Sequence, residues 1–325
     1  MAVLVCGGAG YIGSHMVRFL LERGEDVLVL DDLSTGHRDF VPPSVPFVQG
    51  DVRDATLLGC LFREHRVDAV FHFAAFIQVG ESMRDPLAYY DNNLQGVLRL
   101  LQTMVRHGVE NFVFSSTAAV YGEPELVPIP EDALKCPTNP YGETKLAVER
   151  LLHWTSVAHD LRWSALRYFN ACGAALDGSI GEAHDPETHL IPLVLDAAMG
   201  RRPSVTIFGD DYDTPDGTCI RDYVHVMDLV EAHLLALNAL RSGRRSSVYN
   251  LGNGRGFSVL EVVEACRRVT GRSILVEKGA RRPGDPARLV ASSARIREEL
   301  GWEPRYTALD AIVETAWRWH GKRWG

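Results

Sequence analysis

Tyr141 and Lys145 are the residues of this sequence whose types and spacing first suggest chemistry. They occur in the segment Pro-Tyr-Gly-Glu-Thr-Lys at 140–145, four positions apart, so a helix would place both side chains on one face. A phenol near an ammonium and a bound cationic cofactor is expected to lose its proton more easily than free tyrosine. Tyr141 is therefore a candidate general acid and base. Because the spacing alone is also that of an ordinary surface pair, the assignment depends on the elements around it.

A glycine-rich turn near the start of the chain indicates a dinucleotide cofactor. The apolar run at 2–6 is followed by Gly-Gly-Ala-Gly-Tyr-Ile-Gly at 7–13, a helical pattern, a second apolar run at 27–30 and then Asp31. Glycines allow a tight turn and let the backbone approach a pyrophosphate at the helix N-terminus. An acid at the end of the second strand accepts hydrogen bonds from the adenosine ribose, which favours NAD over NADP.

Further apolar runs predict the rest of a parallel sheet. We expect buried strands at 45–52, whose Asp51 and Val52 would reach the adenine, and at 67–75, and a helix over 92–107 leads to a strand at 111–117. Strands that alternate with helices in this way form a doubly wound parallel α/β sheet of Rossmann type. Ligands of such a sheet bind beyond the carboxyl ends of its strands, where Ser115 and Thr117 would lie.

Composition sets limits on the class of protein. With 325 residues, the chain is long enough for two domains, and its formal net charge of −8 argues against a general affinity for nucleic acid or anionic membranes. We expect no membrane-spanning segment and no signal peptide, because the apolar runs are too short. The six scattered cysteines are typical of reduced cytoplasmic thiols, and without a His-Glu-x-x-His motif we assign no metal.

Several longer motifs carry a resemblance to a known family. The N-terminal half resembles the extended short-chain dehydrogenase/reductases, and the C-terminal half is similar to their UDP-galactose 4-epimerase branch. The motifs are GGAGYIGSH at 7–15, HFAA at 72–75, VGES at 79–82, YYDNN at 89–93, FSSTAAVYG at 114–122, YGETK at 141–145, LRYFNACGA at 166–174, FGDDYDTPDGTCIRDYVHVMDL at 208–229 and YNLGNG at 249–254.

The resemblance implies a role for particular residues. It assigns catalysis to Tyr141, Lys145 and Thr117. For cofactor binding it implies Gly7, Gly10, Tyr11, Ile12, Gly13, Asp31, Asp32, Asp51, Val52, Phe73, Ala74, Asn92, Ser115, Tyr141, Lys145 and Tyr168. For the UDP-sugar it implies Thr117, Tyr141, Asn170, His189, Leu190, Phe208, Arg221, Arg282, Asp285 and Leu289.

The reaction implied by the resemblance is reversible epimerisation at C4 of a UDP-hexose through a 4-keto sugar. Tyr141 would take the proton of the 4-hydroxyl, Thr117 would position that hydroxyl, and Lys145 would hold the pKa of the phenol down. Because the net redox change is zero, NAD would stay tightly bound.

Two alanines after Thr117 separate this reaction from its neighbours in the same fold. Dehydratases and decarboxylases of nucleotide sugars place carboxylates there to transfer protons, and Ala118 and Ala119 cannot do so. A 4-epimerase that prefers UDP-N-acetylhexosamines or UDP-uronic acids stays open, because Leu289, at the expected gate of the sugar pocket, is intermediate in size. A non-catalytic Rossmann protein that senses nucleotides is disfavoured by the presence of both Tyr141 and Lys145.

The expected organisation is an NAD-binding domain at 1–170, rejoined by a segment around 219–252, and a smaller α/β nucleotide-sugar-binding domain at 171–325. Helices are expected at 190–199, 227–240 and 310–319, and a short strand at 205–208. The resemblance also implies a cytoplasmic homodimer in which the helices at 92–107 and 140–158 of each subunit form a four-helix bundle.

Overall fold

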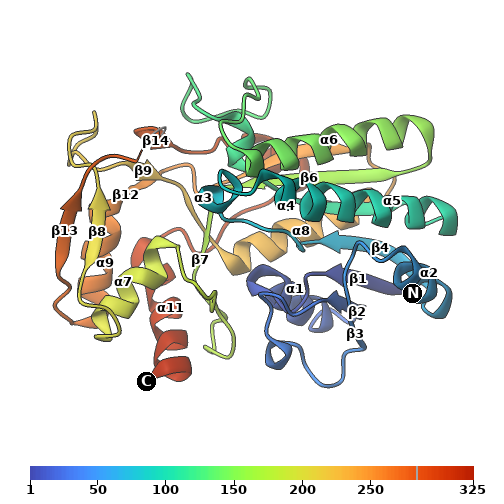
Figure 1. The fold of residues 1–325 in the computed structure, drawn as a ribbon, viewed down its shortest axis with the longest axis horizontal. Coiled ribbons are helices and arrows are strands. Elements are labelled where there is room, and N and C mark those ends of the chain that lie inside the picture. Colours follow the sequence, from blue (N-terminus) through green and yellow to red (C-terminus); the bar gives the residue numbers. More distant parts are fainter. Residues whose placement is uncertain (283–284) are drawn as a thin grey trace.

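The computed structural model describes residues 1–282 and 285–325. Within these residues, seven parallel strands form one sheet in the order β11-β6-β5-β4-β1-β2-β3, which we call the large sheet (Figure 1). Its strands are β1 (Ala2–Cys6), β2 (Asp26–Asp31), β3 (Phe47–Gln49), β4 (Val67–His72), β5 (Asn111–Thr117), β6 (Arg162–Tyr168) and β11 (Ser247–Leu251). The predicted doubly wound Rossmann-type sheet is confirmed.

Helices cover both faces of the large sheet. They are α1 (Tyr11–Leu21), α2 (Ala55–Glu64), α3 (Val79–Ser82), α4 (Pro86–Tyr89), α5 (Gly96–His107), α6 (Pro140–Ala158) and α8 (Val226–Arg241). Successive residues of β1 point to opposite faces: Val3 and Val5 belong to the core that includes α1 and α8, whereas Leu4 belongs to the core that includes α2, α5 and α6. Burial on both faces explains why the strands are continuous apolar runs.

The C-terminal part is built from short strands in small sheets beside a helical layer. The small sheets pair β7 (Asn170–Cys172) with β10 (Tyr223–His225), β9 (Ile220–Arg221) with β12 (Phe257–Ser258) and β14 (Arg288–Leu289), and β8 (Val205–Phe208) with β13 (Val276–Gly279). The helices of this part are α7 (Leu190–Ala198), α9 (Val259–Thr270), α10 (Ala294–Leu300) and α11 (Leu309–Trp324). Helices α7, α9 and α11 share a core, at the opposite end of the molecule from α2 in Figure 1.

Some predicted elements differ from the structure at their ends. The run at 45–52 is a strand only over Phe47–Gln49, the run at 67–75 ends as a strand at His72, and the helix expected at 92–107 begins as a π-helix over Tyr90–Gln95. The backbone N–H groups of Phe73 and Ala74 both donate to Cys6 O, so the chain bends towards the glycine turn there instead of extending β4.

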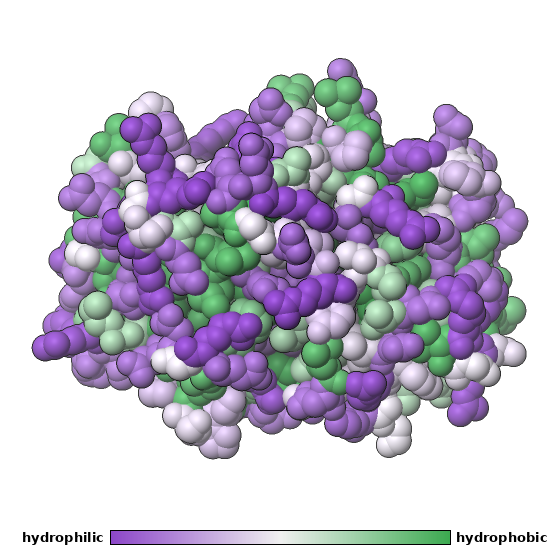
Figure 2. All heavy atoms as spheres, turned by 180° about the vertical axis from the view of Figure 1, so that it is seen from behind, coloured by the Kyte–Doolittle hydropathy of each residue, from purple (hydrophilic) through white to green (hydrophobic). Residues whose placement is uncertain are grey.

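Within the segment around 219–252, which was expected to rejoin the NAD-binding domain, strand β11 joins the large sheet by pairing with β6. Strands β9 and β10 of the same segment pair in the small sheets. The division into domains at residue 170 stays a prediction. Among the helices of the described residues, none combines the length and apolar character needed to cross a bilayer. Seen from behind, polar side chains cover much of the surface, and apolar side chains show between them in separate patches (Figure 2).

Candidate active site

The carboxyl end of β5 and the first turns of α6 bring the predicted catalytic residues together. Asn139 caps α6 by accepting a hydrogen bond from Gly142 N at 2.9 Å, and Pro140 occupies the first turn, so the helix begins just before Tyr141. One turn later, Lys145 Nζ donates to Ser115 O on β5 at 2.9 Å. Thr117, the last residue of β5, lies near enough to the Tyr141 phenol to lower its pKa. The three predicted catalytic side chains therefore form one cluster.

Burial dominates the electrostatics of this cluster. It raises the pKa of Tyr141, and the nearby Thr117 side chain opposes that rise only in part. Burial also lowers the pKa of the Lys145 ammonium to about 7. The lowering of the Tyr141 pKa expected from Lys145 together with a bound cationic cofactor stays a prediction, and in the protein by itself removal from water is the largest influence on this phenol.

Tyr168, at the end of β6, extends the cluster. Its hydroxyl is hydrogen-bonded to Ser115 Oγ, and both side chains are buried. Burial raises the pKa of Tyr168, so this phenol stays protonated at neutral pH. Ser115 thus links the strand that carries Thr117 to the neighbouring strand β6.

The glycine turn between β1 and α1 has the shape that a pyrophosphate needs. Gly7 has φ +78°, and a Cβ on Gly13 would lie 2.0 Å from Gly7 O, so neither position tolerates a side chain. Gly10 is the N-cap of α1, and Tyr11 and Ile12 form its first turn, where the backbone N–H groups point outwards. The backbone of Ala74 borders the turn, since a Cβ on Gly7 would lie 2.5 Å from Ala74 N. These residues fit NAD, which they would hold by its pyrophosphate.

The predicted acidic contacts of NAD are in three different settings. Asp31 is buried at the end of β2 and accepts hydrogen bonds from Ala9 N and Leu33 N, both at 2.8 Å, so it also holds the glycine turn in place. Asp32 is exposed and accepts from Ser34 N. Asp51 lies beyond β3 in an ion pair with Arg53 at 2.6 Å. The contacts of these three acids with NAD stay predictions.

The other predicted cofactor residues lie around the same edge of the large sheet. Val52 is buried in the core, Phe73 packs beside His233 with ring centroids 5.0 Å apart, and Asn92 lies in the π-helix, where it donates to Asn93 Oδ1 at 3.1 Å. The contacts of these residues with NAD stay predictions.

Asn170, His189 and Leu190, three of the predicted substrate residues, line a common pocket. It lies between β7, the start of α7 and helix α11. Asn170 Nδ2 donates to Asp222 O at 2.8 Å, which fixes the amide at the start of β7. Tyr11 OH donates to Gly173 O at 2.7 Å and connects this region to the glycine turn.

The remaining predicted substrate residues form two pairs and one packing contact. Arg221 on β9 forms an ion pair with Asp285, and the guanidinium of Arg282 lies 4.1 Å from the centre of the Phe208 ring. Leu289 on β14 is in register with Arg221. Leu289 also packs against the cluster formed by Val120, Tyr121, Ile129 and Leu146, beside the elements that carry Thr117 and Tyr141. This contact places the expected gate residue close to the catalytic elements.

A buried polar network behind the catalytic cluster was missed by the sequence reasoning. Glu149 lies one further turn along α6 from Lys145, accepts from Ser116 Oγ at 2.6 Å and pairs with Arg167 on β6. Arg167 also donates to Tyr121 OH at 2.8 Å. The spacing of Tyr141, Lys145 and Glu149 at intervals of four is the signal that could have revealed it.

Comparisons with known proteins agree with this architecture. The chain matches the model of the NAD dependent epimerase/dehydratase family over residues 3–252. It is 57% identical to a UDP-glucose 4-epimerase of Halalkalibacterium halodurans over 320 residues, 98% of this chain and 96% of that protein. It also resembles a crystal structure of UDP-glucose 4-epimerase with a TM-score of 0.98 and 54% identity, covering 99% of this chain and 98% of the other.

A third similar protein was solved with ligands. It is the UDP-glucose 4-epimerase of Bifidobacterium longum in complex with NAD⁺ and UDP, with a TM-score of 0.93 and 39% identity over 99% of both chains. The family model covers well over half of the sequence, and the relatives match it almost from end to end. This chain is a member of the NAD dependent epimerase/dehydratase family.

Proposed function

We propose that this protein is an NAD-dependent isomerase that interconverts UDP-galactose and UDP-glucose at C4. The observation that carries the proposal is the cluster of Tyr141, Lys145 and Thr117, followed by Ala118 and Ala119. The similar proteins are UDP-glucose 4-epimerases, one of them solved with NAD⁺ and UDP.

The chemistry follows from what each side chain can do. As the phenolate, Tyr141 Oη accepts the proton of the 4-hydroxyl and returns it at the end of the cycle, and the positive charge of bound NAD⁺ would favour that phenolate. Thr117, close to the phenol, orients the hydroxyl of the sugar. Bound NAD supplies the acceptor and later the donor of the hydride at C4. Lys145, with its pKa lowered to about 7, becomes more fully charged whenever negative charge develops on Tyr141.

The role of the UDP-sugar contacts is part of the same proposal. Arg221, paired with Asp285, and Arg282, stacked on Phe208, supply guanidinium groups suited to a diphosphate. Asn170, His189 and Leu190 line the pocket between β7 and the start of α7 and are the further expected contacts of the UDP-sugar.

Turnover of UDP-galactose by the Tyr141→Phe variant tests the mechanism. The variant keeps the aromatic ring and loses the proton-transferring hydroxyl, so kcat should fall by about 10²–10⁴-fold. Tyr306→Phe, which removes a partly buried phenol beside His225, is the matched control. Retained activity in Tyr141→Phe would refute the assignment.

The range of sugars depends on Leu289. A 4-epimerase for UDP-N-acetylhexosamines or UDP-uronic acids is the second candidate, and the partly buried leucine beside Tyr121 and Leu146 supports an intermediate pocket. Parallel assays with UDP-galactose, UDP-N-acetylgalactosamine and UDP-galacturonate, without added NAD, would separate them. Leu289→Ala should raise the relative rate with UDP-N-acetylgalactosamine, and Leu289→Tyr should lower it.

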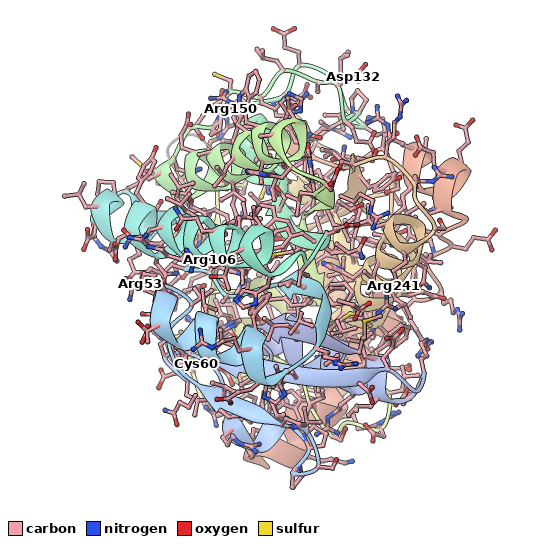
Figure 3. All side chains as sticks on the ribbon, turned by 90° about the vertical axis from the view of Figure 1, so that its right-hand side faces the viewer. Arg53, Cys60, Arg106, Asp132, Arg150 and Arg241 are labelled. Atoms are coloured by element: carbon pink, nitrogen blue, oxygen red, sulfur yellow. The ribbon has the colours of Figure 1, made fainter. Side chains whose placement is uncertain are left out.

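The proposal extends to a cytoplasmic homodimer that acts in galactose metabolism. Helices α5 and α6 lie side by side on one face of the large sheet, and their exposed apolar side chains include Leu98, Trp154 and Val157 (Figures 1 and 3). A four-helix bundle with a second copy would cover them. Light scattering at micromolar concentration should give twice the mass of 36.0 kDa, and Trp154→Glu should shift it towards the monomer. A monomeric wild-type protein would contradict the dimer.

A further inference from the structure

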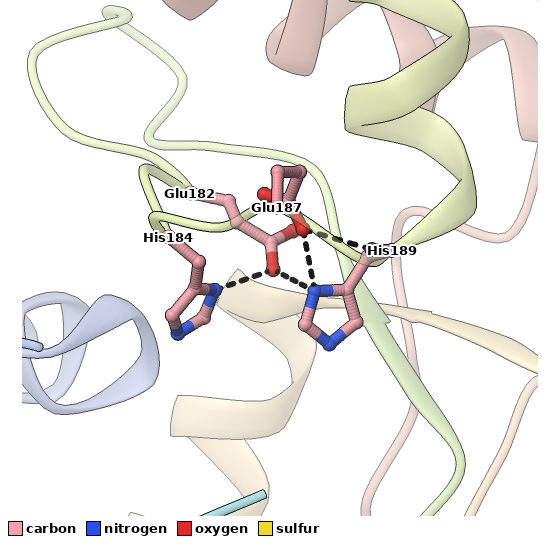
Figure 4. Close-up of side chains that lie close together, drawn as sticks. All are labelled: Glu182, His184, Glu187 and His189. Carbon is pink, nitrogen blue, oxygen red and sulfur yellow. Dashed lines mark hydrogen bonds and ion pairs between the residues drawn. The ribbon is translucent and has the colours of Figure 1, made fainter. Parts of the chain in front are cut away.

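The segment between β7 and α7 gathers two carboxylates and two imidazoles at one point. Glu182, His184, Glu187 and His189 each direct one potential ligand atom inwards, and these atoms lie within 4.8 Å of one another (Figure 4). Glu182 Oε1 lies 3.0 Å from His184 Nδ1 and 2.7 Å from His189 Nδ1. Glu187 Oε1 lies 2.8 Å from the same nitrogen of His189.

The balance of charge at this point favours a cation. The side chains of Glu182 and Glu187 are only 6% and 12% exposed, so their negative charges need a positive partner. Both carboxylates approach His189 Nδ1, but that nitrogen carries at most one proton and cannot donate fully to both. Glu187 Oε1 also accepts from the backbone N–H groups of Thr188 and His189. A metal ion, in contrast, binds several oxygen and nitrogen atoms at once.

The backbone of this segment is held from two sides, so the four side chains are preorganised. The carbonyl of Ala183 is hydrogen-bonded to His37 Nε2 at 2.9 Å, and Trp319 Nε1 on α11 donates to Glu182 O at 2.8 Å. Glu182 and His189 also line a cavity of about 30 Å³, which has room for a water molecule. Anchored ligands beside such a cavity are what a small hydrated cation needs in order to enter and bind.

We propose that Glu182, His184, Glu187 and His189 bind one divalent transition-metal ion, with zinc as the best fit. Two imidazoles together with two carboxylates suit zinc better than magnesium or calcium, which prefer all-oxygen sites. Bonds of about 2.0–2.1 Å in a tetrahedral site separate the ligand atoms by roughly 3.3 Å. The atoms of the closest pairs would therefore move apart by a few tenths of an ångström, and the proton shared with each imidazole nitrogen would leave.

The position of the ion defines its role. His189 is the N-cap of α7, and Leu190 is the first residue of that helix. An ion bound by four protein side chains has no open position for substrate, so it would act on structure by fixing the start of α7. The ion would lie beside the pocket that Asn170 and Leu190 line, and Tyr141 is not among its ligands.

Zinc titration of the full-length, NAD-containing protein after treatment with a chelator tests the proposal. Calorimetry should show one Zn²⁺ per chain, and zinc should raise the thermal midpoint of the wild type. His184→Ala should weaken zinc binding by at least about tenfold, since even residues outside the ligand shell change affinity by 10–100-fold. His153→Ala, on the exposed side of α6, is the matched control and should bind like the wild type.

A second variant and a second metal distinguish the loss of a metal ligand from the misfolding of a variant. Glu187→Gln preserves size and removes the charge, and it should also weaken binding at least about tenfold. Co²⁺ should give the strong visible absorption of a four-coordinate site in the wild type and lose it in both variants. A wild type that binds no zinc, or variants that bind it as the wild type does, would overturn the proposal.

Discussion

The large sheet and the small sheets bury an acidic side chain in opposite ways. Against the large sheet, Glu149 of α6 is paired with the side chain of Arg167 on β6, and the two are only 6% and 3% exposed. Among the small sheets, the fully buried Asp222 accepts hydrogen bonds from the backbone N–H groups of Asn253, Gly254 and Ala291, at 2.6, 3.1 and 3.0 Å.

The difference follows from how each region uses its backbone. Long parallel strands pair their own N–H and C=O groups, so a buried carboxylate such as Glu149 has to find a side-chain partner. Strands of two or three residues leave backbone N–H groups without a ladder, and an acid such as Asp222 satisfies them. The Glu149–Arg167 pair therefore stabilises the contact between α6 and β6, whereas Asp222 organises loops among the small sheets, as Asp31 does at the glycine turn.

Removing Arg167 should give the largest loss of stability. Arg167→Met leaves Glu149 buried without its partner, so the free energy of unfolding should fall by about 3–5 kcal/mol. Urea unfolding followed by circular dichroism measures it. Lys278→Met breaks an exposed ion pair with Asp210 and should leave the urea midpoint unchanged. Equal effects of the two substitutions would break the distinction between buried and exposed pairs.

Burial of Lys145 between α6 and β5 of the large sheet should make the free energy of unfolding depend on pH. Its pKa is about 7 in the folded protein and 10.5 as the ordinary value, so between these values the unfolded chain holds more protons. The free energy of unfolding should therefore rise with pH across this window, by up to about 4 kcal/mol at 1.36 kcal/mol per pH unit. Below pH 7 the cost of the buried ammonium is fully present.

The free energy of unfolding of NAD-free protein, measured at about pH 7 and about pH 10, tests this rise of stability with pH. The wild type should gain stability relative to Lys145→Met as the pH rises, whereas Lys322→Met, at an exposed position, should follow the wild type. Parallel pH profiles for the wild type and Lys145→Met would show that Lys145 does not titrate in this range.

Substitution of Asp222 should cause the smallest of these losses of stability, and the most local one. Asp222→Asn replaces the carboxylate by an amide that can accept through one oxygen only, so unfolding should become easier by about 1.5–3 kcal/mol. Hydrogen exchange should increase first at Asn253, Gly254 and Ala291, which lose their acceptor. Increased exchange spread evenly over the large sheet would contradict a loop-organising role.

The sequence predicted the large sheet well because its strands are short-range patterns, and the resemblance named the three residues that the structure brings together as the candidate catalytic cluster. The apolar runs of β1, β2 and β5 are contiguous, and Tyr141 and Lys145 are one helical turn apart on a helix with a clear N-cap. Thr117 could be expected near the ligands because the strand that carries it ends at the carboxyl edge of the sheet, where such folds bind ligands.

Apart from β8, which was predicted at 205–208, the small sheets and the loop at 182–189 were out of reach for the same physical reason. A strand of two residues such as β9 has no detectable alternation, and it exists because β12 and β14 lie on either side of it. Glu182 and His189 meet because His37 and Trp319 hold the intervening backbone, and such long-range contacts leave no period in the sequence. The π-helix over Tyr90–Gln95 is likewise indistinguishable from an α-helix by pattern.

The pairing of β11 with β6 has a consequence for synthesis and for fragments. On the ribosome, the outer edge of β6 is without its neighbour until the chain has been made as far as Leu251. An edge of this kind invites pairing with another chain. A fragment that stops near residue 170 would keep the glycine turn and Tyr141 but expose that edge, so we expect it to aggregate. The nucleotide-binding half thus needs the second half of the gene to become soluble.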